Sequence, residues 1–186
     1  MRFNGGSLDA MDQVRALLSR PSHVLVLGLA TSAMLVLGAH LFEQVGGLPP
    51  CPLCLDQREA HWTAMALAAL GVAAMRFTTI AHIGAAALGA LALVYGFSMV
   101  LAAFHAGVEW RFWPGPATCG GISSDGVNAA DILGALDKAP GPVSCADAPW
   151  RLLGVSMAGY NALISAALFA LTGAGAVISA RRMNAA

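Results

Sequence analysis

Two pairs of cysteines are the residues of this chain best suited to chemistry. Cys51 and Cys54 form a Cys-Pro-Leu-Cys motif directly before an apolar segment, whereas Cys119 and Cys145 lie in the only long polar stretch. All four fall outside the long apolar runs. Two dithiol pairs that face one compartment at a membrane surface are typical of an electron relay, because thiol–disulfide exchange passes electrons from one pair to the next.

The first pair lies where a helix is expected to begin. Pro52 suits the first turn of a helix, where its missing N–H costs nothing. This places Cys51 near the N-cap and Cys54 in the first turn, and the positive end of the helix dipole lowers the pKa of a thiol in such a position. Arg58 follows one turn later on the same face, so its guanidinium is predicted to stabilise a Cys54 thiolate or to bind a carbonyl oxygen of a ligand.

Three other interpretations of these residues remain open. A C-x-x-C motif can be half of a zinc site, but Cys119 and Cys145 would have to complete it and their separation is not typical of zinc ligands. We therefore predict no metal. A structural disulfide is a second possibility, although a membrane bundle of four helices needs no such cross-link. Arg58 can also be explained as a residue that extends to the membrane interface.

Proline and glycine surround the second pair. Their presence around Cys119 and Cys145 predicts exposed, adjustable backbone, where thiol–disulfide exchange has access. Within this stretch, Val127 to Lys138 are predicted to form a short helix whose apolar edge lies on the bilayer surface or packs on its neighbours. Tryptophans at the two membrane junctions are interpreted as an interfacial aromatic belt: Trp110, Trp113 and Trp150.

The composition indicates that most of the chain lies in lipid. Hydrophobic residues make up 58% and charged residues 11% of the 186 residues, whereas charged residues make up roughly 25% of a soluble domain. The mean hydropathy is +0.69. The net charge of zero gives no reason to expect nucleic acid as a partner.

Four apolar runs are candidates to cross roughly 30 Å of hydrocarbon as helices. They show no alternation, which favours helices over barrel strands, and their abundant glycine and alanine allow close packing. We therefore predict an all-α membrane protein, a four-transmembrane-helix bundle that forms a single domain over residues 1–186 with one long outward-facing loop. The predicted helices cover about 24–42, 60–75, 80–104 and 152–178, and the predicted periplasmic loops cover about 43–59 and 105–151.

Arginines outside the runs predict the orientation. Lysine and arginine in short loops mark the cytoplasmic side of a membrane protein. Both termini are therefore predicted to be cytoplasmic and all four cysteines periplasmic, in the inner membrane of a bacterium, where disulfides persist on the outer side. The first run is too long for a signal peptide and lacks a suitable cleavage site, so we expect it to be retained. The arginines behind this orientation are Arg2, Arg15, Arg20, Arg76, Arg181 and Arg182.

These residues together resemble the DsbB family of bacterial disulfide-generating membrane oxidoreductases. The resemblance covers nearly the whole chain: four helices, a C-x-x-C motif at the entry to the second, an arginine four residues on, and a second cysteine pair in one outer loop. Three local segments also look like the family, especially its shorter members: 105–110, 113–119 and 145–154.

The resemblance implies a route for electrons. A Cys119–Cys145 disulfide would accept electrons from a reduced periplasmic thioredoxin-fold oxidase of the DsbA type, with Cys119 forming the mixed disulfide. Cys145 would then exchange with Cys51, and Cys54 would reduce a bound ubiquinone or menaquinone. Arg58 would stabilise the thiolate and a quinone oxygen.

Four further polar residues are secondary candidates. The resemblance implies that His105 lies near the quinone, and an ordinary interfacial histidine is the alternative. Glu109 is a weaker candidate for proton handling. His61 lies just beyond the helix face that carries the motif and is expected at most to support it. Asn161, inside the fourth apolar run, is predicted to hydrogen-bond a neighbouring helix.

Two functions of other kinds compete with this one. The chain could be a specialised or vitamin-K-epoxide-reductase-like thiol–quinone oxidoreductase, although that family carries its quinone-facing C-x-x-C late in the chain. It could also be a non-enzymatic membrane protein whose cysteines form permanent structural disulfides. That hypothesis predicts that quinone has no effect on the cysteines.

Overall fold

Four long helices form the body of the protein. The computed structural model describes residues 16, 18, 20–78, 82–119 and 143–185. The short helix predicted for residues 127–138 lies outside the described residues. The four helices are α2 (Pro21–Gln44), α3 (Pro52–Phe77), α4 (Ile83–Glu109) and α6 (Met157–Asn184).

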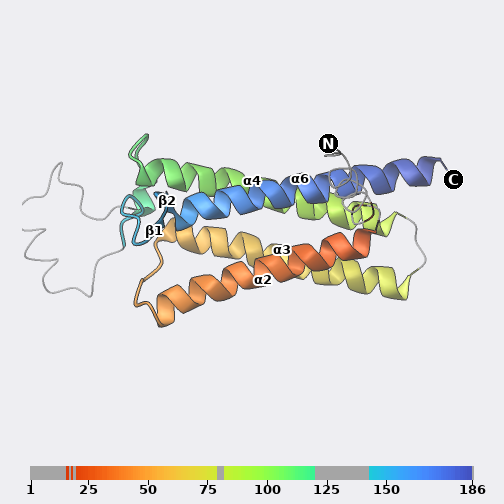
Figure 1. Ribbon diagram of the computed structural model, residues 1–186, viewed down its shortest axis with the longest axis horizontal. Coiled ribbons are helices and arrows are strands. Elements are labelled where there is room, and N and C mark those ends of the chain that lie inside the picture. Colours follow the sequence, from red (N-terminus) through yellow and green to blue (C-terminus); the bar gives the residue numbers. More distant parts are fainter. Residues whose placement is uncertain (1–15, 17, 19, 79–81, 120–142, 186) are drawn as a thin grey trace, which may run out of the picture.

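The four helices alternate in direction, so that each returns the chain to the opposite end of the bundle (Figure 1). The helices α4 and α6 pack along each other, and α3 packs against both α2 and α4. The end of α2, the start of α3, the end of α4 and the start of α6 meet at one end of the molecule. All four cysteines lie at or beside this end of the bundle.

Short elements complete the cysteine-bearing end. A 3₁₀ turn, η1 (Ala117–Cys119), follows α4, and an antiparallel hairpin of β1 (Arg151–Leu152) and β2 (Val155–Ser156) leads directly into α6. The two residues of its turn, Leu153 and Gly154, both have positive φ, of 51° and 81°. Two successive positive φ values are the property of a type I′ turn, which matches the twist of a two-residue hairpin.

The helix boundaries differ from the predicted apolar runs at several ends: α4 continues to Glu109, α6 continues to Asn184, and two helices begin elsewhere. The helix α3 begins at Pro52, as the position of Cys51 near an N-cap predicted, and not near residue 60, because the Cys51 side chain accepts a hydrogen bond from the Cys54 backbone N–H. An apolar run cannot reveal this start, since the first turns of α3 are polar. The helix α6 begins at Met157 and not near residue 152, because the hairpin occupies the residues before it.

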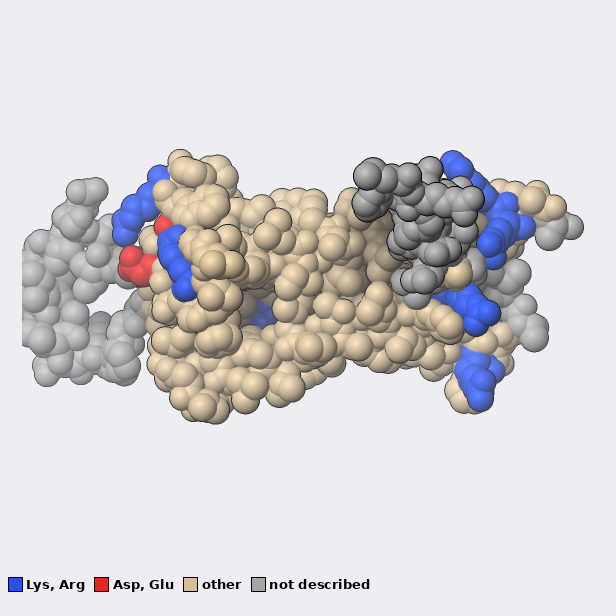
Figure 2. Space-filling model, viewed as in Figure 1, with Lys and Arg blue, Asp and Glu red and all other residues tan. Residues whose placement is uncertain are grey.

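Three of the four helices, α2, α4 and α6, are long and apolar enough to cross a membrane. The helix α3 is long enough, but Asp56, Arg58 and Glu59 make its first half polar. Figure 2 shows the same division on the surface: charged side chains gather at the two ends, and the waist between them is almost free of them. The structure therefore confirms an all-helical membrane protein with three clear candidate spans.

The core contains both leucines and small residues. Leu25, Leu88, Leu91 and Tyr95 are fully buried where the helices meet. Of the glycines in the apolar runs, some lie where a neighbouring helix leaves little room for a Cβ atom, whereas Gly89 and Gly173 face open space. The glycines at helix contacts are Gly28, Gly71, Gly84, Gly96 and Gly175.

Candidate active site

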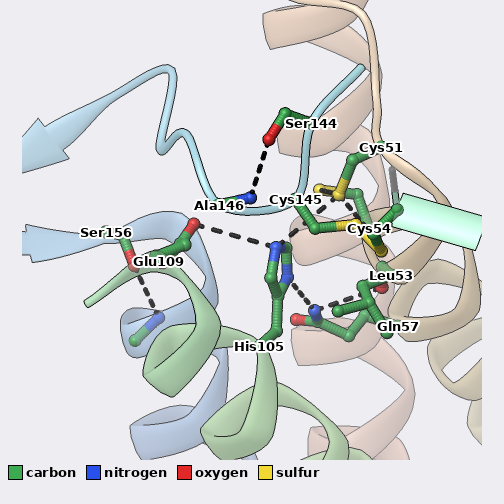
Figure 3. A network of polar contacts seen from close by, with 12 residues as sticks. Cys51, Leu53, Cys54, Gln57, His105, Glu109, Ser144, Cys145, Ala146 and Ser156 are labelled. Carbon is green, nitrogen blue, oxygen red and sulfur yellow. Dashed lines mark hydrogen bonds and ion pairs between the residues drawn. A yellow bond between two sulfur atoms is a disulfide. The ribbon is translucent and has the colours of Figure 1, made fainter. Parts of the chain in front are cut away.

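The two cysteine pairs lie together in one buried cluster (Figure 3). Cys119 and Cys145 form a disulfide with a Cα–Cα distance of 5.3 Å, whereas Cys51 and Cys54 are free thiols. Val108, near the end of α4, belongs to the same cluster. The structure therefore brings all four predicted redox residues to one place, although the pairs are far apart in the sequence.

The loop cysteines are less accessible than the sequence suggests. The residues directly before Cys119 are exposed, as predicted, but Cys119 is 7% exposed and Cys145 is 1% exposed, so the expected access does not extend to the two sulfurs in the disulfide state. The described prolines and glycine before Cys119 make a tight turn: the Cys119 N–H donates to the Pro116 carbonyl at 2.8 Å, and Gly115 lies close to Val108. This turn folds the disulfide onto the end of α4.

The sulfurs of the first pair have unequal roles. The Cys51 thiol donates a hydrogen bond to the Cys54 sulfur at 2.9 Å, and the Cys54 backbone N–H donates to the Cys51 sulfur at 3.3 Å. The hydrogen bond to Cys54, together with burial, raises the pKa of the Cys51 thiol above its ordinary value. The helix N-terminus was expected to lower it. Cys51 therefore holds its proton, and the Cys54 sulfur is the acceptor of the pair.

His105 is held beside the first pair, and its place near the quinone, which the family resemblance implied, remains a prediction. Its Nε2 atom lies 3.6 Å from the Cys51 sulfur, and its Nδ1 atom accepts a hydrogen bond from Gln57 Nε2 at 2.7 Å. The imidazole is 2% exposed. Gln57 also donates to the Leu53 carbonyl, so its amide is fixed from both sides. The sequence analysis did not identify Gln57, although it lies one turn after Cys54 in the same helix.

Glu109 closes the other side of the imidazole. Its Oε1 atom lies 3.9 Å from His105 Nε2, and its Oε2 atom accepts a hydrogen bond from the Ser156 hydroxyl (Figure 3). Ser156 also caps α6 by accepting from the Gly159 N–H. The carboxyl group is therefore buried between α4, which carries it, and the start of α6. Its predicted part in proton handling remains a prediction.

Arg58 makes its hydrogen bonds to α2, and its charge also acts on Cys54. Its Nη1 atom donates to Glu43 Oε2 at 2.6 Å and contacts His40 Nδ1 at 3.3 Å. Its Nε atom is buried and has no hydrogen-bond partner among the described residues. Arg58 thus has a structural ion pair that the sequence did not suggest and one N–H that remains available.

A cavity of about 370 Å³ lies next to the first pair. This volume is within the range of roughly 300–1,000 Å³ that is usual for sites that bind small molecules. Cys54, Arg58, His105 and Glu109 contribute to its wall. The remaining wall is mostly apolar and includes Met34, Leu35, Val36, Phe42, Leu48 and Trp150.

Trp150 has a more specific place than an interfacial belt. Its ring packs on Phe42 of α2, with centroids 5.4 Å apart, and on Tyr160 of α6 at 6.1 Å. The three aromatic rings line the cavity together. They join the segment before the hairpin to two helices, so Trp150 belongs to the site and not only to the membrane junction.

Two residues of the helix interiors extend the site. Asn161 donates to Gln57 Oε1 at 2.8 Å, which confirms the predicted hydrogen bond to another helix. His61 is buried and lies 2.8 Å from Asn161 Oδ1. Both residues line the cavity below the cysteines. His61 therefore supports the site through Asn161 and makes no recorded contact with sulfur.

One group of side chains could hold a metal ion. The ligand atoms of Cys51, Cys54 and His105 all lie within 4.8 Å of one another. Two thiolates and an imidazole are ligands that suit zinc. The third donor is a histidine from α4, which the argument from cysteine spacing did not consider.

Buried cysteine pairs beside an apolar cavity, at one end of a membrane bundle, define a membrane thiol oxidoreductase. Residues 21–175 match the family described as disulfide bond formation protein DsbB. The chain belongs to this family, whose members are quinone-dependent disulfide oxidoreductases.

Individual relatives agree with the family assignment. Disulfide bond formation protein B of a Polaromonas species is 32% identical over 160 residues, which cover 80% of this chain and 86% of the relative. The protein of the same name from Verminephrobacter eiseniae is 33% identical, with 80% and 81% covered, and that from Polaromonas naphthalenivorans is 30% identical, with 78% and 84% covered. No solved structure gives a significant match. The matches do not favour either alternative function.

Proposed function

We propose that this chain oxidises a thioredoxin-fold oxidase of the DsbA type at Cys119–Cys145 and passes the electrons through Cys51 and Cys54 to a quinone in the cavity. The observation that carries the proposal is the position of Cys54. It belongs to a cysteine pair that shares a buried cluster with the disulfide, and it also lines the apolar cavity.

The exchange steps balance in electrons and protons. Two thiols of the partner reduce the Cys119–Cys145 disulfide, and the partner leaves with a disulfide of its own. The new dithiol then reduces a Cys51–Cys54 disulfide by attack of Cys145 on Cys51. The result is a reduced first pair and an oxidised loop pair, which is the combination found in the structure.

The residues around the cavity fit a quinone. A quinone supplies an acceptor for two electrons and two protons, and the oxidation of Cys51 and Cys54 to a disulfide releases that number of each. Apolar walls suit a ring with a lipid tail, whether ubiquinone or menaquinone. Arg58 contributes to the same wall, and its buried Nε–H, which has no partner among the described residues, is a candidate donor to a carbonyl oxygen once a ligand moves the side chain.

The orientation follows from the same arrangement. The helix α3 runs antiparallel to α2 and α4, both of which are apolar enough to cross a membrane, so we infer that α3 crosses as a fourth span. Arg76, Arg181 and Arg182 lie at the ends of α3 and α6 that are opposite to the cysteines. The rule that positive residues stay inside supports a cytoplasmic C-terminus and periplasmic cysteines in a bacterial inner membrane.

Quinone absorbance tests the proposal. Purified protein in detergent, mixed with quinone and a reduced DsbA-type partner, is expected to consume one quinone for each pair of partner thiols. Cys54→Ser should stop quinone consumption, and Cys119→Ser should prevent a trapped mixed disulfide with the partner. Undiminished quinone consumption by Cys54→Ser would overturn the proposal.

A further inference from the structure

A continuous line of hydrogen bonds crosses the bundle and ends at the cysteines. It begins at Ser32 of α2, whose hydroxyl lies 3.2 Å from His61 Nδ1 of α3. His61 Nε2 lies 2.8 Å from Asn161 Oδ1 of α6, and Asn161 Nδ2 donates to Gln57 Oε1 of α3 at 2.8 Å. Gln57 Nε2 then donates to His105 Nδ1 of α4 at 2.7 Å. The line joins all four helices.

The direction of each bond follows from the chemistry of the groups. Asn161 Oδ1 only accepts, so His61 must donate to it from Nε2. The orientation of both amides is fixed at Gln57, whose Nε2 donates to the Leu53 carbonyl and leaves Oε1 to accept from Asn161 Nδ2. The recorded partners of His61 are neutral, and a buried neutral imidazole carries one N–H. Its Nδ1 atom is therefore an acceptor. The single hydroxyl hydrogen of Ser32 is shared between this atom and the Tyr95 oxygen at 2.9 Å, because Tyr95 donates its own hydrogen to the Gly28 carbonyl.

The same logic fixes the tautomer of His105. Because Nδ1 accepts from Gln57, the proton of the neutral ring is on Nε2. This N–H faces the Cys51 sulfur at 3.6 Å, and the Cys145 backbone carbonyl and the Glu109 carboxylate, at 3.9 Å, are the other nearby acceptors. Cys51 in turn donates to Cys54. Five hydrogen bonds therefore point the same way, from His61 to the sulfur of Cys54.

We propose that this chain positions His105 as its Nε2–H tautomer and thereby makes Cys54 the sulfur of the pair that carries negative charge. Each donor in the line leaves the next group free to donate onward, and the last acceptor is the sulfur in the cavity wall. His61, Asn161 and Gln57 are positioning residues that act through His105. The inference deepens the proposed function, because it states how the reacting sulfur is selected.

Two physical points support this assignment. Hydrogen bonds in series polarise one another in a medium of low dielectric constant, so a uniform direction strengthens the terminal donor. If the amide of Gln57 were turned over, its oxygen would face the Leu53 carbonyl oxygen, and a buried polar atom would be left without a partner. This is costly inside a bundle. Amide groups do not relay protons, so the line fixes an orientation and is not a proton path. It also leaves His105 Nε2 without a lone pair for a metal ion.

The groups around Cys54 define what a test must separate. Cys51 and His105 act along the line, whereas Glu109 and Arg58 act on Cys54 through their charges. A variant should therefore reverse the direction of the hydrogen bonds in this line and leave these four residues unchanged. Asn161→Asp meets this requirement for the His105 tautomer, because a carboxylate cannot donate to Gln57. Gln57 is then expected to give up its bond to the Leu53 carbonyl and turn its N–H to residue 161 and its oxygen to His105, which moves the His105 proton to Nδ1. The added charge also acts on Cys54, so the alkylation rate is compared with that of the uncharged variant Gln57→Leu.

Two measurements on the reduced protein in detergent test the inference. Two-bond ¹H–¹⁵N spectra of histidine-labelled protein, with His105 assigned by its loss in His105→Asn, should show Nε2–H in the parent and Nδ1–H in Asn161→Asp. Alkylation of Cys54 by iodoacetamide at pH 7, read by peptide mass, should be about tenfold slower in Asn161→Asp. Ser165→Ala is the matched control, since it removes another bond to the same Asn161 oxygen and should alter the alkylation rate less than about twofold.

The outcomes are distinct. An Nδ1–H tautomer in the parent, or unchanged spectra and alkylation in Asn161→Asp, would overturn the inference. An equal loss of alkylation in Ser165→Ala would also overturn it, because it would reduce the role of Asn161 to packing. If Asn161→Asp does not fold, Gln57→Leu should give a mixture of His105 tautomers and slower alkylation of Cys54. Neither measurement uses quinone, so the proposed function can fail or stand independently.

Discussion

Arg58 and Cys51 both behave differently from what their places in the sequence suggest. Arg58 follows the C-x-x-C motif by one turn, but Glu43 of α2 holds one side of its guanidinium and turns it along the cavity wall. Cys51 caps a helix N-terminus, but its hydrogen bond to Cys54 keeps its proton in place. Arg58 is held by a partner from another helix, and Cys51 is held by the other cysteine of its own motif.

Arg58→Ala should weaken quinone use. The loss of a charge-assisted hydrogen bond costs about 1.5–3 kcal/mol, so the KM for quinone is expected to rise about 10- to 100-fold in a quinone-absorbance assay. The rate of thiol exchange with a DsbA-type partner should stay unchanged, because the loop cysteines do not contact Arg58. The exposed Arg111 serves as a control at the same end of the molecule, and Arg111→Ala should leave the KM unchanged. An unaltered KM in Arg58→Ala would remove Arg58 from the quinone site.

Cys54→Ala should make Cys51 reactive at lower pH. The hydrogen bond to Cys54 is the largest cause of the raised pKa of Cys51, so its removal should lower that pKa toward the ordinary thiol value. The pH midpoint for alkylation of Cys51, measured by peptide mass, should therefore fall relative to the reduced parent protein. A midpoint that stays in place would assign the shift to burial alone.

At the scale of elements, local signals in the sequence predicted the start of α3 better than hydropathy did. Pro52 and Cys51 mark the helix start by capping chemistry, whereas the apolar run begins well inside the helix. The hairpin before α6 was not predicted, because each strand has two residues and Leu153 adopts a positive φ that is rare for leucine. The formation of so short a hairpin depends on its contacts with Glu109, to which both Arg151 and Ser156 donate hydrogen bonds. The sequence does not reveal these contacts.

Gly107→Ala tests how the end of α4 is built. A Cβ atom at Gly107 would overlap the Trp113 ring, which stacks on Phe104 and donates to its carbonyl at 3.0 Å. The substitution should destabilise the protein by about 1–3 kcal/mol, seen as a lower Tm in detergent. Gly89→Ala is the matched control, because Gly89 lies in the same helix with open space around it. Equal Tm values for both variants would contradict this account of Trp113.

At the scale of the whole molecule, composition predicted a helical membrane protein, and the motif residues predicted which side chains form the site. Cys51 and Cys54 were identified because paired thiols carry redox chemistry, and His105 was identified through the family resemblance. Gln57 and Ser156 were not, because an isolated amide or hydroxyl has no signature in a sequence. Their roles arise from contacts between helices that are far apart along the chain.

Single cysteines introduced into a cysteine-free version test the orientation. Leu153 at the hairpin tip is 92% exposed, and Phe77 at the end of α3 is 85% exposed, so both positions are open to reagents. A membrane-impermeant maleimide should label Leu153→Cys in cells with a permeabilised outer membrane. Phe77→Cys should react only after the inner membrane is disrupted. The opposite pattern would reverse the proposed orientation.

The most direct test of the electron route is the redox state of each cysteine pair during a single turnover without quinone. Fully oxidised protein is mixed with one equivalent of reduced DsbA-type partner, quenched with acid, and its free thiols are blocked and located by peptide mass. The account predicts free thiols at Cys51 and Cys54 with an intact Cys119–Cys145 disulfide. Free thiols that accumulate at Cys119 and Cys145, beside an intact Cys51–Cys54 disulfide, would contradict it.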